Sequence, residues 1–204
     1  MPLKPVLSVD LQMIPPVVVV LAAGRGERFA ASGASVHKLQ ALLAGKPVLD
    51  HVLDAVRASG LPYHVVMADP ARPGMGDSIA AGVRATPGAN GWLILPADLP
   101  LISSDTLKKI ALAPPCAVTV PMVQGQRGHP VRFGPECAQE LLNLQGNQGA
   151  AQLIHARAAT DLIAFMDLDD VGCITDVDTL ADLQHAEKLL AERQAISPSS
   201  LPSA

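Results

Sequence analysis

The stretch VVVVLAAGRGER, residues 17–28, decides the fold class of this chain. It begins with a short apolar run of β-branched residues, which is typical of a strand buried on both faces of a parallel sheet. A turn containing Gly24 and Gly26 follows directly, and glycine allows the backbone to approach a ligand closely. A buried strand that ends in such a turn predicts an open α/β sheet with a ligand site at the carboxyl end of the strand.

Similar apolar runs recur along the chain, and helical patterns separate them. The other predicted strands are residues 63–68, 92–96, 117–123 and 162–168. The predicted helices are residues 47–59, 77–85, 103–111, 135–144, 148–158 and 179–193, with Ser103 or Ser104 as the cap of the third. This alternation predicts a three-layer α/β/α Rossmann-like domain with a mostly parallel sheet and an antiparallel excursion at residues 131–133. We expect one domain at residues 15–194, a lead-in at 1–14 and a disordered tail at 195–204.

The composition excludes several classes of protein. Of 204 residues, 49% are hydrophobic and 17% are charged, which is not the signature of a disordered chain. The formal net charge of −4 argues against nucleic-acid binding by bulk charge, which needs a basic surface. Three cysteines without a CxxC pair argue against a disulfide framework, and no apolar run approaches the ~20 residues that span a bilayer. We therefore expect a cytoplasmic protein with neither a nucleic-acid nor a membrane partner.

The glycine turn carries the first chemical signal. Backbone N–H groups there can cradle a phosphate, and Arg25 and Arg28 can clamp it with charge-assisted hydrogen bonds. The dinucleotide fingerprint needs a third glycine where this chain has Phe29, and the Gly-Lys-Ser/Thr ending of a Walker loop is absent. A plain surface turn with solvated arginines stays open as the alternative. Lys38 follows shortly and could reach back to a triphosphate as a compact charge.

Acidic residues after later strands carry the second signal. Asp98 follows a buried apolar run and lies between two prolines, which suits a ligand for a hard cation such as Mg²⁺. In the segment DVDT, residues 176–179, one carboxylate could be a second ligand while Asp178 or Thr179 caps the following helix. Helix capping alone explains the acidic residues of the segment at 176–179 about equally well.

Taken together and in order, these motifs resemble the molybdopterin nucleotidyltransferase-like family, and within it most closely the molybdenum cofactor cytidylyltransferases. The resemblance runs from about residue 17 to residue 190. The matching pieces are LAAGRGER at 21–28, Lys38 before GKPVL at 45–49, GMGDSIAAG at 74–82, DLP at 98–100, RGHPV at 127–131, GNQG at 146–149 and DVDT at 176–179. The chain departs from the family pattern after Phe29, where Ala30 stands in place of a glycine.

The resemblance implies roles for the residues at the nucleotide. Those that would bind the triphosphate are Gly24, Arg25, Gly26, Arg28 and Lys38. Leu21, Ala22 and Ala23 would bind substrate, with the two alanines facing the base. Ser78 would help to hold the base or the ribose.

The resemblance also implies a metal site and an acceptor side. Asp98 would be the principal Mg²⁺ ligand and Asp178 the second, with Asp176 as the weaker candidate. His129 would either touch the phosphate of the pterin or order its loop. Gln148 would open a helix whose N-terminal N–H groups suit an anion.

The function implied is the transfer of CMP from CTP to the terminal phosphate of molybdopterin, with Mg²⁺ as cofactor and pyrophosphate as product. Relatives that use GTP resemble LAGG at the turn, so Ala23 favours CTP. The nearest alternative is guanylyl transfer, or transfer to another phosphorylated acceptor. A nicotinamide-dependent oxidoreductase is a second alternative, which the missing glycine disfavours. A third is a non-catalytic protein that binds the cofactor and delivers it to a molybdoenzyme.

Overall fold

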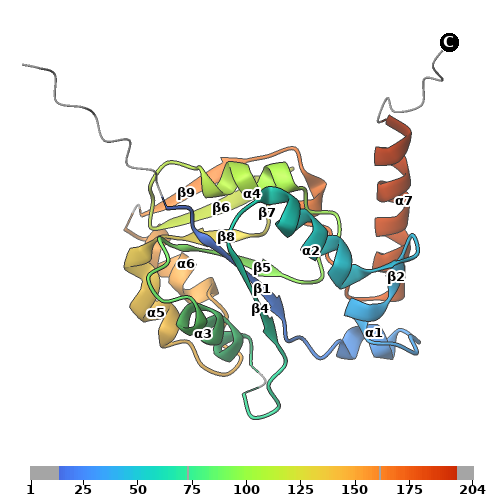
Figure 1. The fold of residues 1–204 in the computed structure, drawn as a ribbon, viewed down its shortest axis with the longest axis horizontal. Helices are drawn as coiled ribbons and strands as arrows, with labels where there is room; N and C mark the ends of the chain where they lie inside the picture. The colour runs from blue at the N-terminus through green and yellow to red at the C-terminus, as the bar shows by residue number, and fades with distance from the viewer. Residues whose placement is uncertain (1–13, 73, 161, 197–204) are drawn as a thin grey trace, which may run out of the picture.

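The computed structural model describes residues 14–72, 74–160 and 162–196. Within these ranges the main sheet has five parallel strands: β1 (Val17–Ala22), β4 (Tyr63–Met67), β5 (Trp92–Pro96), β6 (Val118–Val123) and β9 (Ile163–Asp167). Two short strands, β7 (Gln126–Arg127) and β8 (Val131–Phe133), run antiparallel to them. The order is β4-β1-β5-β8-β6, with β9 on the other side of β6 and β7 paired with the end of β6 (Figure 1).

The sheet separates two hydrophobic cores, and β1 serves both of them. Side chains alternate between the faces of a strand, so Val18 and Val20 pack into one core and Val19 into the other. All three have no exposed surface, which explains why β1 is a continuous apolar run. The sequence pattern that predicted a doubly covered strand therefore follows from the position of β1 in the middle of three layers.

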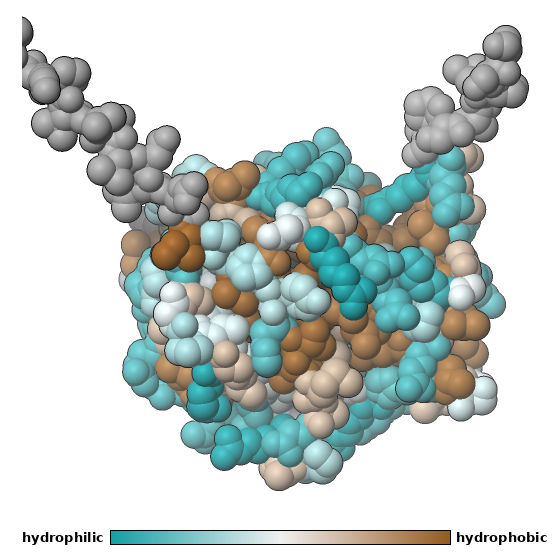
Figure 2. Space-filling view, in the orientation of Figure 1, coloured by the Kyte–Doolittle hydropathy of each residue, from teal (hydrophilic) through white to brown (hydrophobic). Residues whose placement is uncertain are grey.

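Helices cover both faces of the sheet (Figure 1). On the first core lie α2 (Val48–Ser59) and α4 (Ser104–Ala111), with part of α7 (Leu180–Ile196). On the second core lie α3 (Met75–Ala85), α5 (Ala138–Leu142) and α6 (Ala151–Ala158). The space-filling view is mostly hydrophilic over the helices, with apolar side chains visible near the middle, where β1 and β4 lie (Figure 2). The predicted three-layer α/β fold is confirmed.

Short elements complete the fold. They are α1 (Glu27–Ala31), the 3-10 turns Lys38–Gln40, Pro135–Cys137 and Val171–Cys173, and the hairpin of β2 (Leu42–Leu43) with β3 (Lys46–Pro47). No helix in the part of the chain that the structure describes is both long and apolar enough to cross a membrane.

The predicted strands agree with the observed ones to within one residue at either end, but three other expectations need correction. The helix expected to open at Gln148 begins at Ala151, because the N–H of Gln148 bonds to the carbonyl of Gln145 in a turn. The helix expected at 135–144 is a 3-10 turn followed by the shorter α5. Helix α7 continues to Ile196, so part of the expected tail is helical, whereas 197–204 and lead-in residues 1–13 lie outside the described residues.

The connections determine where a ligand site can form. Helix α2 leads from β1 to β4 on one side, and α3 then carries the chain back across β1 to β5 on the other. The loops after β1 and β5 therefore leave the sheet side by side, where the N–H of Ala97 donates to the carbonyl of Leu21 at 3.2 Å. In open α/β sheets such a switch point is where ligands bind.

Candidate active site

The loop after β1 presents backbone donors at the switch point. Gly26 has a φ of 66°, a left-handed conformation that glycine adopts at little cost. The N–H groups of Gly24, Arg25 and Gly26 make no hydrogen bond to the described parts of the chain. Consecutive unpaired N–H groups at an exposed loop form a concave donor surface that suits an anion.

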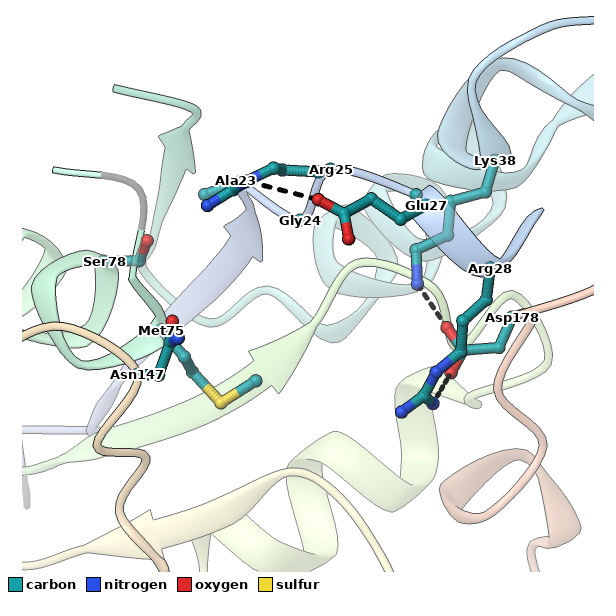
Figure 3. Close-up of a pocket in the computed structure, with 11 residues that line it drawn as sticks. Ala23, Gly24, Arg25, Glu27, Arg28, Lys38, Met75, Ser78, Asn147 and Asp178 are labelled. Carbon is teal, nitrogen blue, oxygen red and sulfur yellow. Dashed lines mark hydrogen bonds and ion pairs between the residues drawn. The ribbon is translucent and has the colours of Figure 1, made fainter. Parts of the chain in front are cut away.

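A cleft of about 590 Å³ opens beside this loop. Its lining residues are Ala23, Gly24, Arg25, Gly26, Glu27, Arg28, Lys38, Met75, Ser78, Asn147 and Asp178. Figure 3 shows Met75, Ser78 and Asn147 on one side of the cleft and Lys38, Arg28 and Asp178 on the other. The cleft thus has one wall in which Arg28 and Lys38 meet Asp178, and an opposite wall built by the start of α3 and the loop before α6.

Lys38 links the loop after β5 to the segment just before α7. Its Nζ donates to Oδ2 of Asp98 at 2.6 Å and to Oδ1 of Asp178 at 2.7 Å. Arg28 donates to the other oxygen of Asp178 at 2.8 Å. The side chain of Lys38 is only 10% exposed, whereas that of Arg28 is 80% exposed. Two cations and two carboxylates therefore balance one another at the floor and rim of the cleft.

The close contacts shift the ionisation of these groups. Burial by itself would lower the pKa of Lys38, but the charges and hydrogen bonds of Asp98 and Asp178 outweigh burial and raise it. The hydrogen bond from Lys38 lowers the pKa of Asp178 despite partial burial. The charges of Lys38 and Asp178 are therefore both present at neutral pH.

The start of α7 separates the two acidic candidates, Asp176 and Asp178. Thr179 caps the helix: its Oγ1 accepts from the N–H of Asp182 at 3.2 Å, and the carboxylate of Asp182 accepts from the N–H of Thr179 at 2.7 Å. Asp178 is therefore not needed as the cap and points to Lys38. Asp176 does not line the cleft, and burial together with the nearby carboxylates raises its pKa.

The pair Asp98 and Asp178 fits a hard divalent cation. Oδ1 of Asp98 is buried and has no hydrogen-bond partner among the described residues, so none of these residues satisfies this oxygen of the carboxylate. Among the described residues, no group of three or more His, Cys, Asp or Glu could hold a metal by itself. A cation such as Mg²⁺ typically takes one or two carboxylates and completes its shell with substrate phosphates and water.

A second cavity of about 300 Å³ adjoins the cleft, and Met75 lines both. Its walls are largely apolar and come from β1, β5, β8 and α6, with Arg127, His129 and His155 as polar residues. Nδ1 of His129 is buried and has no partner in the described part of the chain, and burial lowers the pKa of this residue, so the ring is neutral at pH 7. The backbone N–H of His129 bonds to the carbonyl of Cys173 at 2.9 Å, which fixes the segment.

The structure brings most of the sequence-predicted residues together. Those that line the cleft or bond at its floor are Ala23, Gly24, Arg25, Gly26, Arg28, Lys38, Ser78, Asp98 and Asp178. Leu21 and His129 line the second cavity, whereas Ala22 is buried and Gln148 lines neither. Three further residues, Met75, Asn147 and Glu27, line the cleft although the sequence did not predict them there. Asn147 lies within the GNQG motif, one residue before the Gln148 that was chosen.

Comparison with known proteins gives a family match. Residues 18–161 match the family model described as MobA-like NTP transferase domain. The chain is 29% identical over 186 residues to the purine catabolism protein PucB of Bacillus subtilis strain 168, a match that spans 79% of this chain and 90% of PucB.

Solved structures share the fold. Rv0371c from Mycobacterium tuberculosis H37Rv is 25% identical with a TM-score of 0.68, over 85% of this chain and 98% of that one. A structure of Rv0371c in complex with manganese is 22% identical, with a TM-score of 0.65 over 84% and 97% of the two chains. Molybdopterin-guanine dinucleotide biosynthesis protein A from Archaeoglobus fulgidus is 16% identical, with a TM-score of 0.59 over 86% and 99%.

Proposed function

Because this chain belongs to the MobA-like NTP transferase domain family and is a nucleotidyltransferase of that family, we propose that it transfers CMP from CTP to the terminal phosphate of molybdopterin. An oxygen of the acceptor phosphate attacks the α-phosphorus of CTP, and a new P–O–P link forms. The bond between the α-phosphorus and the bridging oxygen to the β-phosphate breaks, and pyrophosphate leaves with the electron pair.

The observation that carries this proposal is that Lys38 meets Asp98 and Asp178 next to the loop of residues 24–26 after β1, called the donor loop below. Transfer at phosphorus needs positioning and charge neutralisation more than covalent help from the protein. The N–H groups of residues 24–26, with Arg25, Arg28 and Lys38, would hold the β- and γ-phosphates and stabilise the leaving pyrophosphate. The acceptor phosphate is already anionic, so no general base is required.

Asp98 and Asp178 would hold the divalent cation, for which we propose Mg²⁺. When bound, Mg²⁺ polarises the α-phosphate and offsets the negative charge that develops on it. The protein's own part is to keep the two carboxylates at one point of the cleft and to keep Lys38 beside them, at the place where the phosphates would bind.

The base and the acceptor would occupy opposite ends of the site. Ala23 and Ser78 would face the base, with Leu21 and Ala22 behind them in β1. The methyl group of Ala23 narrows the cleft relative to a glycine, which is the reason to prefer the smaller pyrimidine of CTP. The second cavity, with His129 in its wall, would take the acceptor, and Gln148 lies in the loop beside it.

The test measures pyrophosphate release with molybdopterin, Mg²⁺ and each of the four nucleoside triphosphates in turn. We expect turnover with CTP to exceed that with GTP, and Asp98→Asn to lower it at least about 100-fold. Asp105→Asn is the matched control because its carboxylate is 79% exposed on α4, away from the cleft. Full activity of Asp98→Asn would contradict the assigned metal ligand.

The same assay separates the alternatives. Faster turnover with GTP would make the protein a guanylyltransferase. Because the chain is similar to a purine catabolism protein, other phosphorylated acceptors belong in the assay, and transfer to one of them would replace molybdopterin in the proposal. Binding of CTP without turnover would favour a delivery protein that serves a molybdoenzyme, and saturable binding of NADPH would favour an oxidoreductase.

A further inference from the structure

His37 lies between the donor loop and Lys38, although no motif of the sequence drew attention to it. Its Nε2 is 2.9 Å from the carbonyl oxygen of Gly24, and its Nδ1 is 3.3 Å from the backbone nitrogen of Leu39. His37 is not among the residues that line the cleft, so its ring supports the loop from behind.

The two hydrogen bonds fix the protonation of the His37 ring. The N–H of Leu39 can only donate, so Nδ1 must accept and must carry a lone pair. The proton of the neutral ring is therefore on Nε2, which donates to the carbonyl of Gly24. The ring of His37 thus connects the loop to the turn at residues 38–40: Nε2 donates a hydrogen bond to the loop, and Nδ1 accepts one from the turn.

Packing around the His37 ring is close. A Cβ atom on Gly26 would lie 3.2 Å from Nε2 of His37 and 3.5 Å from Cγ of Lys38. The loop therefore rests on the ring and on the stem of Lys38, and Gly26 provides both the space and the left-handed φ that this arrangement requires.

The bond to Gly24 also orients the donors of the loop. In a trans peptide the C=O and the following N–H point in opposite directions. Since the carbonyl of Gly24 is turned to His37, the N–H of Arg25 points away from the ring, and it makes no hydrogen bond to the described residues. This N–H is therefore available to a phosphate oxygen.

We propose that His37 is a positioning residue, which holds the donor loop and Lys38 in one arrangement for binding the triphosphate. The proposal rests on the proposed function for the ligand, but the tether itself is a property of the free protein. His37 acts through Gly24 and Lys38 and touches no substrate.

Two substitutions of His37 each remove one of its two hydrogen bonds and keep the other. The amide of glutamine reaches as far as Nε2, so His37→Gln keeps a donor for Gly24 and loses the acceptor for Leu39. The amide of asparagine reaches only as far as Nδ1, so His37→Asn keeps the acceptor and loses the tether to Gly24. His51→Asn is the matched control, because Nε2 of His51 makes the same kind of bond to the carbonyl of Leu43 at 2.8 Å, outside the cleft.

The experiment combines ¹⁵N relaxation of the free protein, calorimetric titration with CTP and Mg²⁺, and thermal unfolding. We expect His37→Asn to raise the mobility of Gly24 and Gly26 and to weaken CTP binding roughly five- to tenfold, the loss typical of one hydrogen bond. His37→Gln and His51→Asn should bind CTP within about twofold of the wild type. Ring ¹⁵N shifts of His37 should report the neutral form protonated at Nε2.

Two results would overturn the proposal: a ring protonated at Nδ1, or a His37→Asn variant whose loop is as rigid as that of the wild type. A loss of affinity that follows the unfolding temperature across all three variants would also overturn it, because that pattern marks a purely structural role. If the wild type binds no nucleoside triphosphate, the proposed function fails, and the relaxation data still decide whether His37 holds the loop.

Discussion

Replacing Lys38 with methionine removes the cation that Asp98 and Asp178 share. Oδ2 of Asp98 lies 2.6 Å from Nζ and Oδ1 of Asp178 lies 2.7 Å from it, so these two oxygens are at most about 5.3 Å apart. Two like charges at that distance repel by roughly 3 kcal/mol at an effective dielectric constant of 20. Both carboxylates are partly exposed, and Arg28 still pairs with Asp178, so we expect a loss of about 2 kcal/mol in the free energy of unfolding. For a domain of this size the unfolding temperature falls by about 4–8 °C.

A divalent cation should reverse much of this loss. At about one hundred times its dissociation constant, a ligand that binds only the folded state adds about 2.7 kcal/mol to the stability. In the Lys38→Met variant the carboxylates are free for Mg²⁺, whereas in the wild type the ammonium group must first move away. We therefore expect Mg²⁺ to raise the unfolding temperature of the variant more than that of the wild type.

The assay is thermal unfolding of both proteins in EDTA and in a Mg²⁺ titration, without nucleotide. Lys46→Met is the control, since Lys46 pairs with Asp54 at 2.7 Å on the surface and should show neither effect. Equal stability of Lys38→Met and the wild type in EDTA would refute the calculated repulsion. Equal Mg²⁺ shifts in the two proteins would refute the competition between ammonium and metal.

Four further predictions concern pH, catalysis, base choice and packing. Because Lys38 lowers the pKa of Asp178, this ion pair stabilises the folded state above the ordinary carboxyl pKa of 3.8. The stabilisation should disappear as the pH falls through the pKa of Asp178 in the folded state. Urea unfolding of the wild type and of Lys38→Met between pH 2.5 and 7 measures this contribution. Arg28→Ala should cost roughly 2–4 kcal/mol of transition-state stabilisation in kcat/KM, with unchanged unfolding temperature because the side chain is 80% exposed. Ala23→Gly should lower the ratio of CTP to GTP turnover, measured by competition. Gly74→Ala would place a methyl group 2.0 Å from a backbone carbonyl of the loop before α6, so thermal unfolding should show a loss of more than about 2 kcal/mol.

The fold was predictable because its central elements carry strong local signals. Val18, Val19 and Val20 of β1 are buried on both faces of the sheet, so every position of this run is apolar and the strand is easily recognised in the sequence. Ser103 caps α4 through its bond from the N–H of Thr106 at 3.1 Å, as a serine before an amphipathic segment predicts. The start of α6 was not predictable, because the turn before it is set by contacts between Gly146 and the distant α3, including the N–H of Gly76 bonded to the carbonyl of Gly146.

Some residues of the candidate site could likewise be predicted from the sequence, and others could not. The loop after β1 and Asp98 could be found because each follows directly from a strand whose direction the pattern determines. Met75 and Asn147 could not be found, since they reach the cleft through the packing of the loop before α6 on α3. His37 was missed for a different reason: its role depends on a hydrogen bond to Gly24, thirteen residues earlier, that leaves no periodic trace in the sequence.

The choice between Asp176 and Asp178 shows how a local capping interaction decides chemistry. From the sequence, either carboxylate could serve the cleft and either Asp178 or Thr179 could cap α7. Oγ1 of Thr179 caps the helix by accepting from the N–H of Asp182 at 3.2 Å, and the carboxylate of Asp182 accepts in return from the backbone N–H groups of Asp178 and Thr179, at 3.1 and 2.7 Å. The side chain of Asp178 is then free to meet Lys38, while Asp176, two residues earlier, lies away from the cleft lining.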